Sequence, residues 1–187
     1  MNSIVARCTL LLAAGCAIAG IAPFASAIDP AHEAQANRMS ARAIEWLRTK
    51  QDKNTGGWAV SPDRPAYPAI TGLIINGMLM EPGIDARDPD VARGISFMLS
   101  YAQEDGGIYD RVLPNYNTAI CLSALALAKT EEADRVIPGA QAFLRGLQYG
   151  ESADTTTAAG SETKVVERSH PFYGGVGYGN HGRPDNS

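Results

Sequence analysis

A pair of adjacent glycines recurs three times along the chain, each time after a similar run of residues. An aromatic residue with an apolar neighbour comes first, a glutamine follows, and the two glycines come next. The aromatic pairs are Trp46-Leu47, Phe97-Met98 and Phe143-Leu144, the glutamines are Gln51, Gln103 and Gln148, and the glycine pairs are Gly56-Gly57, Gly106-Gly107 and Gly174-Gly175. A unit of about 50 residues has the length of two helices and their turns. The sequence therefore predicts an all-α protein built from helical hairpins.

The first helix of each hairpin is predicted to be amphipathic and to lie in an outer layer. Asp29-Pro30 and Asp88-Pro89 each place a capping carboxylate before a proline, whose fixed φ suits the first helical position. Pro138 is expected to begin the third such helix. The apolar stripe of the earliest one consists of Met39, Ala43, Trp46 and Leu47, while Arg38, Arg42, Glu45 and Arg48 face away.

The second helix of each hairpin is predicted to lie in an enclosed inner layer. Segments 70–80 and 118–128 are apolar on nearly every side and rich in Gly, Ala and Ser, which permits close helix approach. Thr71 and Thr118 occupy the same place in these segments. The equivalent threonine of a third inner helix would fall at or just past Ser187. The sequence is therefore expected to be a fragment of a longer repeat protein, truncated before that helix.

The first 27 residues are predicted to be a secretory signal peptide. Arg7 is their only charged residue, an apolar run covers 9–22, and small residues suit cleavage near Ala27. The repeat domain then covers 28–187, and the protein is expected to be exported, either to the periplasm or as a secreted protein. A transmembrane anchor and lipid attachment at Cys16 are the alternatives.

Charge and cysteine content argue against several classes of function. Removal of the signal peptide takes away Arg7 and no acidic residue, so the formal charge moves from −4 to −5 and does not favour nucleic acid. Cys121 is then the single cysteine, which excludes an intramolecular disulfide and suggests a small buried side chain. The polar segment 150–169 interrupts only the third unit and is expected to be a surface loop, with a cavity lid as the less favoured use.

Residues 46–58, with their aromatic-apolar pair, glutamine and glycine-rich turn, resemble the QW-type repeat of squalene and oxidosqualene cyclases. The resemblance to protein prenyltransferase β subunits is looser. The resemblance to the QW-type repeat covers nearly all of 28–187 in three degenerate copies. The resemblance implies an α/α toroid, in which an outer ring of helices surrounds an inner ring and a cavity opens at one end.

The chemistry of that family is not visible in the sequence. The acidic D-x-D-D motif of squalene cyclases is absent, and Asp85, Asp88 and Asp90 are interpreted as exposed capping and solvating residues. The resemblance to prenyltransferases would place a zinc ligand at Asp185, but Ser187 stands where their cysteine is expected. No metal and no cofactor are therefore predicted, and whether the chain is an enzyme stays open.

Polar and aromatic residues in the turns before the inner helices are expected to gather at one rim of a cavity, where an apolar, isoprenoid-like molecule or a glycan could dock. These residues are Trp58, Tyr67, Tyr109, Tyr116, Asn117, Tyr173, Tyr178, His181 and Asp185.

The favoured function is that of an exported prenyltransferase/squalene-cyclase-like repeat protein with a binding or structural role and possible self-association through the open repeat edge. The first alternative is a cyclase-like isomerase whose acid motif lies in missing C-terminal sequence. The second is a glycan-active α/α-toroid enzyme, which would need paired carboxylates across the cavity.

Overall fold

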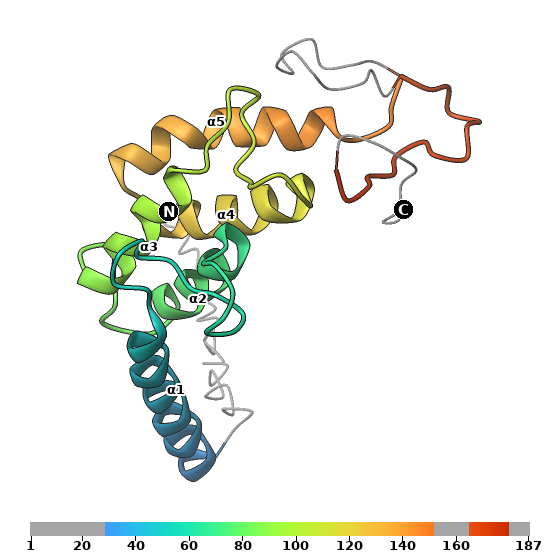
Figure 1. Cartoon of the computed structure of the whole chain (residues 1–187). Coiled ribbons are helices and arrows are strands. Elements are labelled where there is room, and N and C mark those ends of the chain that lie inside the picture. The colour runs from blue at the N-terminus through green and yellow to red at the C-terminus, as the bar shows by residue number, and fades with distance from the viewer. Residues whose placement is uncertain (1–28, 152–164, 180–187) are drawn as a thin grey trace, which may run out of the picture.

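The computed structural model describes residues 29–151 and 165–179, and this part of the chain contains five helices and no strand (Figure 1). The helices are α1 (Pro30–Lys50), α2 (Pro68–Leu79), α3 (Pro89–Leu99), α4 (Pro114–Ala128) and α5 (Glu131–Gly146). The predicted all-α class is confirmed for the described residues. The expected signal peptide, Cys16, His181, Asp185 and most of segment 150–169 lie outside them.

Two of the predicted helix starts are confirmed. The Asp29 carboxylate accepts a hydrogen bond from the backbone N–H of Ala31 at 2.9 Å, at the start of α1. Asp88 does the same for Asp90 at 3.0 Å, at the start of α3. Both aspartates satisfy N–H groups that a helix leaves without internal partners, and both precede a proline at the first helical position.

The predicted start of the third outer helix at Pro138 is wrong, because Pro138 lies inside α5. Thr130 caps this helix, since its Oγ1 accepts from the backbone N–H of Ala133 at 3.2 Å. The first turn carries three acidic residues, whose negative charges stabilise the helix because its N-terminus is the positive end of the helix dipole. These are Glu131, Glu132 and Asp134. The cap and the charges together move the helix start upstream of the proline.

The helices form a packed body from which α1 projects. α2 packs most extensively against α4, α3 packs on α2, and α5 packs on α4. Figure 1 shows α1 extending away from the other helices, and no residue of α1 is buried. The packed body contains the core, whose fully buried side chains include Ile75, Met78, Met98 and Leu125. This arrangement makes α2 and α4 the inner pair and α3 and α5 the outer pair.

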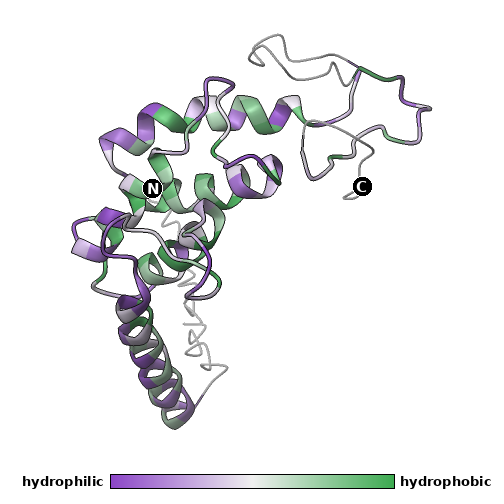
Figure 2. Cartoon of the chain, viewed as in Figure 1, coloured by the Kyte–Doolittle hydropathy of each residue, from purple (hydrophilic) through white to green (hydrophobic). Residues whose placement is uncertain are grey.

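The inner helices are less enclosed than predicted. Figure 2 shows them coloured as largely hydrophobic, in contrast to the mixed colouring of α1. Leu73 of α2, Met80 directly after its end and Leu127 of α4 nevertheless leave 54%, 77% and 44% of their surfaces exposed. No helix in the described ranges is both long and apolar enough to span a membrane.

Candidate functional site

The three glycine turns close with the same pair of backbone hydrogen bonds. In each turn, a residue shortly after the end of the outer helix makes both hydrogen bonds. Its N–H donates to the carbonyl of the second glycine, and its carbonyl accepts from the N–H of the first glycine. This residue is Asp52 in the first turn, Gln103 in the second and Tyr149 in the third, with all six N···O distances between 2.8 and 3.0 Å. The first glycine of each pair has a φ of +81° to +88°, which a residue with a side chain rarely adopts. The repeat is therefore present in the backbone as well as in the sequence.

Two of the three glutamines donate a side-chain hydrogen bond to the carbonyl of the first glycine of their turn. The Nε2 of Gln51 donates to the carbonyl oxygen of Gly56 at 2.8 Å, and that of Gln148 donates to Gly174 at 2.9 Å. Gln103 was aligned with them in the sequence, and the structure corrects this alignment. It stands one place later, at the turn-closing position, and its Nε2 donates instead to the carbonyls of Tyr101 and Tyr109.

The third turn keeps its geometry despite the polar segment inside it. Gln51 and Gly56 are five positions apart, whereas Gln148 and Gly174 are 26 positions apart. The same hydrogen bond closes both turns, so the additional residues between Gln148 and Gly174 do not change the hydrogen bonding that closes the third turn. Among the additional residues that are described, the N–H of Val166 donates to the carbonyl of Gly150 at 2.8 Å, which pairs the two sides of the segment at its base.

The predicted equivalence of Thr71 and Thr118 is confirmed. Each threonine lies early in an inner helix, is fully buried, and accepts a hydrogen bond on its Oγ1 at 2.9 Å. The donor is the backbone N–H of the residue that follows the glycine pair, which is Trp58 in the first unit and Ile108 in the second. Each turn is thus fastened to the inner helix of its own unit by one buried hydroxyl.

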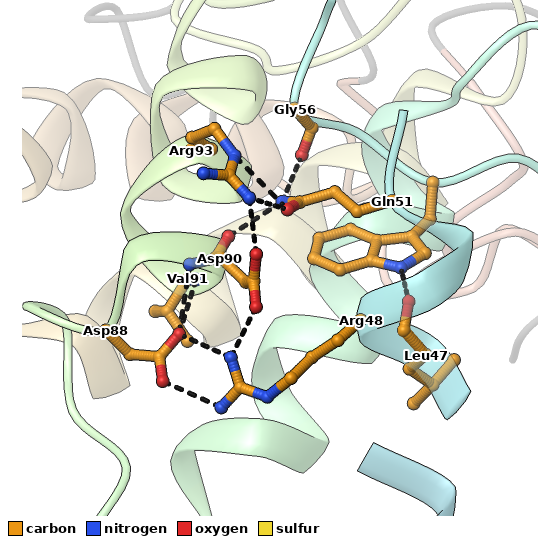
Figure 3. A network of polar contacts seen from close by, with 9 residues as sticks. Leu47, Arg48, Gln51, Gly56, Asp88, Asp90, Val91 and Arg93 are labelled. Carbon is orange, nitrogen blue, oxygen red and sulfur yellow. Dashed lines mark hydrogen bonds and ion pairs between the residues drawn. The ribbon is translucent and has the colours of Figure 1, made fainter. Parts of the chain in front are cut away.

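A polar cluster joins α1 to the start of α3 (Figure 3). The guanidinium of Arg48 donates to both carboxylate oxygens of Asp88, at 2.9 and 2.7 Å, and also pairs with Asp90. Arg93 pairs with Asp90 and donates to the Oε1 of Gln51 at 2.7 Å. The Nε2 of Gln51 in turn donates to the backbone carbonyl of Asp90 at 2.8 Å. The cluster therefore links the end of one outer helix to the beginning of the next.

The prediction that Asp88 and Asp90 are exposed is wrong. Their side chains retain only 18% and 16% of their accessible surface, because Arg48 reaches over them from α1. Hydrogen bonding from Arg48 holds the pKa of Asp88 below its usual range. A carboxylate that an arginine holds in its ionised form is a poor proton donor. Asp85 does remain exposed, and it pairs with Arg87.

Two of the expected rim residues are buried and used within the fold. The Trp58 side chain is 1% exposed, and its Nε1 donates to the carbonyl of Leu47 at 2.7 Å. Asn117 is also 1% exposed. Its Oδ1 accepts from the N–H of Ala69 at 3.2 Å, and its Nδ2 donates to the carbonyl of Leu113 at 2.9 Å. Trp58 thus joins the first turn to the end of α1, and Asn117 joins the starts of the two inner helices, so both side chains are used within the fold.

The tyrosines of the expected rim connect neighbouring units. The hydroxyl of Tyr67, at the start of α2, donates to the carbonyl of Asp110 at 3.1 Å. The rings of Tyr116 and Tyr178 stack with 5.0 Å between their centroids. In both cases the start of an inner helix meets the chain that follows the next glycine turn.

Tyr109 is held inside the second turn instead. Its hydroxyl donates to the Oδ2 of Asp105 at 2.6 Å, and its ring stacks on Phe143 of α5 with 5.7 Å between the centroids. Desolvation, together with the hydrogen bond to Asp105, raises the pKa of Tyr109 to about 12. Tyr173 is 39% exposed in the third turn. The structure therefore brings Tyr116 and Tyr178 together but employs Trp58, Asn117 and Tyr109 elsewhere.

An open pocket of about 610 Å³ lies in the loop before α2. The described residues that line it are Val60, Ser61, Arg64, Pro65 and Tyr67. Tyr67 is the one expected rim residue among these five. The others carry no motif that marks them in the sequence. The residues that the structure describes contain no group of three or more His, Cys, Asp or Glu side chains that could hold a metal ion.

Comparisons with known proteins do not add a relative to these observations. No family model matches the chain, and no curated protein and no solved structure matches it. Fold and function must therefore be inferred from the repeated turns, the polar cluster and the pocket themselves.

Proposed function

We propose that this chain is an exported helical repeat protein of the squalene cyclase and prenyltransferase toroid type, with a binding or structural role. The observation that carries this proposal is the use of the polar side chains near the turns to join helices and neighbouring units. Among the described residues, no buried side-chain nitrogen or oxygen lacks a hydrogen-bond partner. A catalytic site ordinarily holds polar groups free to meet a substrate.

The step from one unit to the next supports the toroid type. The backbone of Arg93 in α3 packs against Gly56 of the first turn, and the backbone of Gly139 in α5 packs against Gly106 of the second. The inner helices α2 and α4 pack side by side. Repetition of one such step, with turns meeting outer helices and inner helices meeting each other, curves a chain of hairpins into a solenoid or a ring.

In the described part of the chain, the acids of the polar cluster are unsuited to proton donation, which favours binding over isomerisation. A cyclase of the resembling family needs a carboxylic acid whose proton can be given to a polyene. Asp88 is held ionised by Arg48, and Asp90 is paired with both Arg48 and Arg93. Tyr109 keeps its proton to about pH 12. These described groups are unsuited to protonating an alkene, so a cyclase activity would need an acid outside them.

The pocket before α2 supports an apolar, isoprenoid-like ligand. Val60 and Pro65 offer apolar contact, and the ring of Tyr67 adds a face that suits an alkene chain. Its volume of about 610 Å³ lies within the range of small-molecule sites. Arg64 adds a positive charge at the lining, which would suit an anionic headgroup.

Incubation of the purified chain with squalene tests the proposal. We expect the squalene to be recovered unchanged and to co-elute with the protein on gel filtration. Val60→Arg, at a side chain that is 77% exposed, should weaken this retention, whereas Met39→Arg on α1, at 64% exposed, should not. A cyclised product would overturn the binding role in favour of catalysis. Equal retention by the two variants would show that the pocket is not the binding site.

A further inference from the structure

One face of α1 and the third glycine turn are uncovered, although their counterparts in the other units cover each other. We propose that they cover each other between two copies of this chain, so that α1 of one copy docks head to tail on the Gly174 turn of the next. The inference rests on the proposed binding or structural role of the repeat protein, and it names a second copy as the partner.

The first turn shows what a covered turn looks like. A Cβ on Gly56 would lie 2.8 Å from the carbonyl oxygen of Arg93, and one on Gly57 would lie 2.7 Å from the ring of Phe97. A Cβ on Gly94 would lie 3.0 Å from the ring of Trp58. The contact therefore uses three positions of α3, namely the aromatic residue and the residues three and four places before it.

The second turn uses the same three positions of the next outer helix. Gly139 lies four places before Phe143, and a Cβ on Gly106 would lie 2.6 Å from its carbonyl oxygen. Ala140, three places before the aromatic residue, is fully buried. Phe143 stacks on Tyr109, which lies two places after the glycine pair of that turn. Two units of this chain thus share one mode of contact.

α1 has residues at the same three positions, but no glycine turn of the described chain packs on them. They are Arg42, Ala43 and Trp46, and all three are exposed. Trp46 is 59% exposed, whereas Phe97 and Phe143 are only 6% and 5% exposed. Within residues 29–151 and 165–179, the one ring contact at Trp46 comes from its own helix, where the Nζ of Lys50 lies 5.4 Å from the ring centroid. Ala43 gives this position a small residue, as Gly94 and Ala140 do in the other two helices, which allows a turn to approach closely.

The third turn is the other half of such a contact. It has the backbone hydrogen bonds of the covered turns, and Gly174 has the same positive φ of +81° as Gly56. Gly56 is buried and Gly106 is half-buried, but Gly174 is exposed. Apart from Gly174 itself and its two neighbours in the chain, no described residue has an atom within 4 Å of a Cβ built on Gly174. The backbone is therefore set for an outer helix that the described residues do not provide.

A second copy suits this place because the chain already shows twice what covers a glycine turn. The occupant must be an outer helix with a small residue three places before an aromatic one, and α1 is such a helix. The contact joins two different surfaces, so it is heterologous and leads to a closed ring or an open chain of copies. The association is therefore expected to extend with rising protein concentration.

Matched substitutions on the two sides of α1 test the proposal. Ala43 and Ala41 are both exposed alanines of α1, but only Ala43 lies on the stripe of Trp46. Ala43→Glu would place a charge against the turn and should raise the dissociation constant of self-association about tenfold or more. Ala41→Glu should leave it unchanged. Sedimentation equilibrium of the full chain over a range of concentrations measures both.

Crosslinking locates the contact independently. In a chain with Cys8 and Cys16 replaced by serine, Arg42→Cys and Tyr173→Cys are made as separate variants and mixed with a short bismaleimide. Cys121 is buried and should not react. We expect crosslinked pairs from this mixture, and far fewer from Ala41→Cys mixed with Tyr173→Cys.

The outcomes separate this inference from the proposed function. A chain that stays monomeric at all concentrations overturns head-to-tail docking, as does equal weakening by Ala43→Glu and Ala41→Glu. A monomer that retains squalene without converting it leaves the binding role standing. Formation of a cyclised product overturns the proposed function, whatever the mass of the protein.

Discussion

Gly106 of the second glycine turn lies directly against the backbone of Gly139 in α5. A Cβ on Gly106 would come within 2.6 Å of the Gly139 carbonyl oxygen and 3.2 Å of its Cα. Both atoms belong to the main chain, so neither can move aside as a side chain would. This contact fixes the distance between the second turn and the outer helix of the third unit.

The contact predicts different costs for the same substitution at two glycines. Gly106→Ala and Gly174→Ala introduce a methyl group at φ values of +88° and +81°. In each variant, backbone strain should lower the free energy of unfolding by about 1 kcal/mol. Gly106→Ala also overpacks the contact with Gly139, which should add about 1–3 kcal/mol. Urea unfolding at low protein concentration measures both. Equal losses for the two variants would show that the turn and α5 do not touch in solution.

The ion pair between Arg48 and Asp88 predicts a loss of stability in acid. The hydrogen bonds from Arg48 lower the pKa of Asp88 from its ordinary value of 3.8. A lowered carboxyl pKa stabilises the fold at pH values above the ordinary pKa, and the stabilisation disappears as the pH falls through the lowered value. Arg48→Met should therefore reduce the free energy of unfolding by about 1–3 kcal/mol at pH 7.

The pH dependence separates this effect from a loss of packing. The difference between the wild-type chain and Arg48→Met should shrink as the pH falls from about 4 through the lowered pKa of Asp88, because the carboxyl then becomes protonated in the folded chain as well as in the unfolded one. Arg38→Met, an exposed arginine of the same helix, serves as the control and should cost little at any pH. A difference that stays constant from pH 7 to pH 3 would refute the role given to the ion pair.

Burial predicts that Cys121 is chemically inert in the folded chain. Its side chain is fully buried in α4, and desolvation raises the pKa of the thiol to about 12. The reactive thiolate is therefore scarce at neutral pH and out of reach of reagents. Iodoacetamide at pH 8 should leave the Cys121 peptide unlabelled in the native protein and label it in urea, as judged by mass spectrometry. Rapid native labelling would mean that α4 is not packed as described.

The predicted signal peptide can be tested by expressing residues 1–187 and identifying the N-terminus of any exported chain. Expression with the natural N-terminus in a Gram-negative host should release a chain that begins at or near Ile28. N-terminal sequencing of the exported fraction identifies that residue. Retention of residues 1–27 would contradict cleavage near Ala27, and attachment of lipid at Cys16 would favour the anchored alternative.

Local patterns predicted the units of this fold well. The caps at Asp29 and Asp88 depend on residues adjacent in sequence, and their side chains need reach only two or three positions. Thr71 and Thr118 were recognised as equivalent from their place in two similar apolar runs. These features are determined within a single helix or turn, so the sequence alone contains the information.

The errors at Gln103 and Pro138 could have been avoided from the sequence alone. Gln103 follows Phe97 by six positions, whereas Gln51 follows Trp46 by five, and this difference predicts the shift that the structure shows. Pro138 resembled the other helix starts, but the stronger signal was Thr130 with its acidic first turn.

The remaining errors concern contacts between distant parts of the chain. Asp88 and Asp90 were expected to be exposed because nothing near them in sequence covers them. Arg48 does so from 40 and 42 positions away. Asn117 was expected at a rim, yet its side chain joins α4 to Ala69 at the start of α2. Burial of this kind depends on how whole helices pack, which periodicity does not determine.

The first two units of the chain are equivalent, because in each of them one threonine hydroxyl of the inner helix accepts a hydrogen bond from the backbone of the glycine turn. Amide hydrogen exchange, resolved by residue, tests it most directly. We predict slow exchange at the N–H groups of Trp58 and Ile108. Thr71→Val should accelerate exchange at Trp58 alone, and Thr118→Val at Ile108 alone. Fast exchange at both positions in the unaltered chain, or no response to either substitution, would contradict the equivalence of the units.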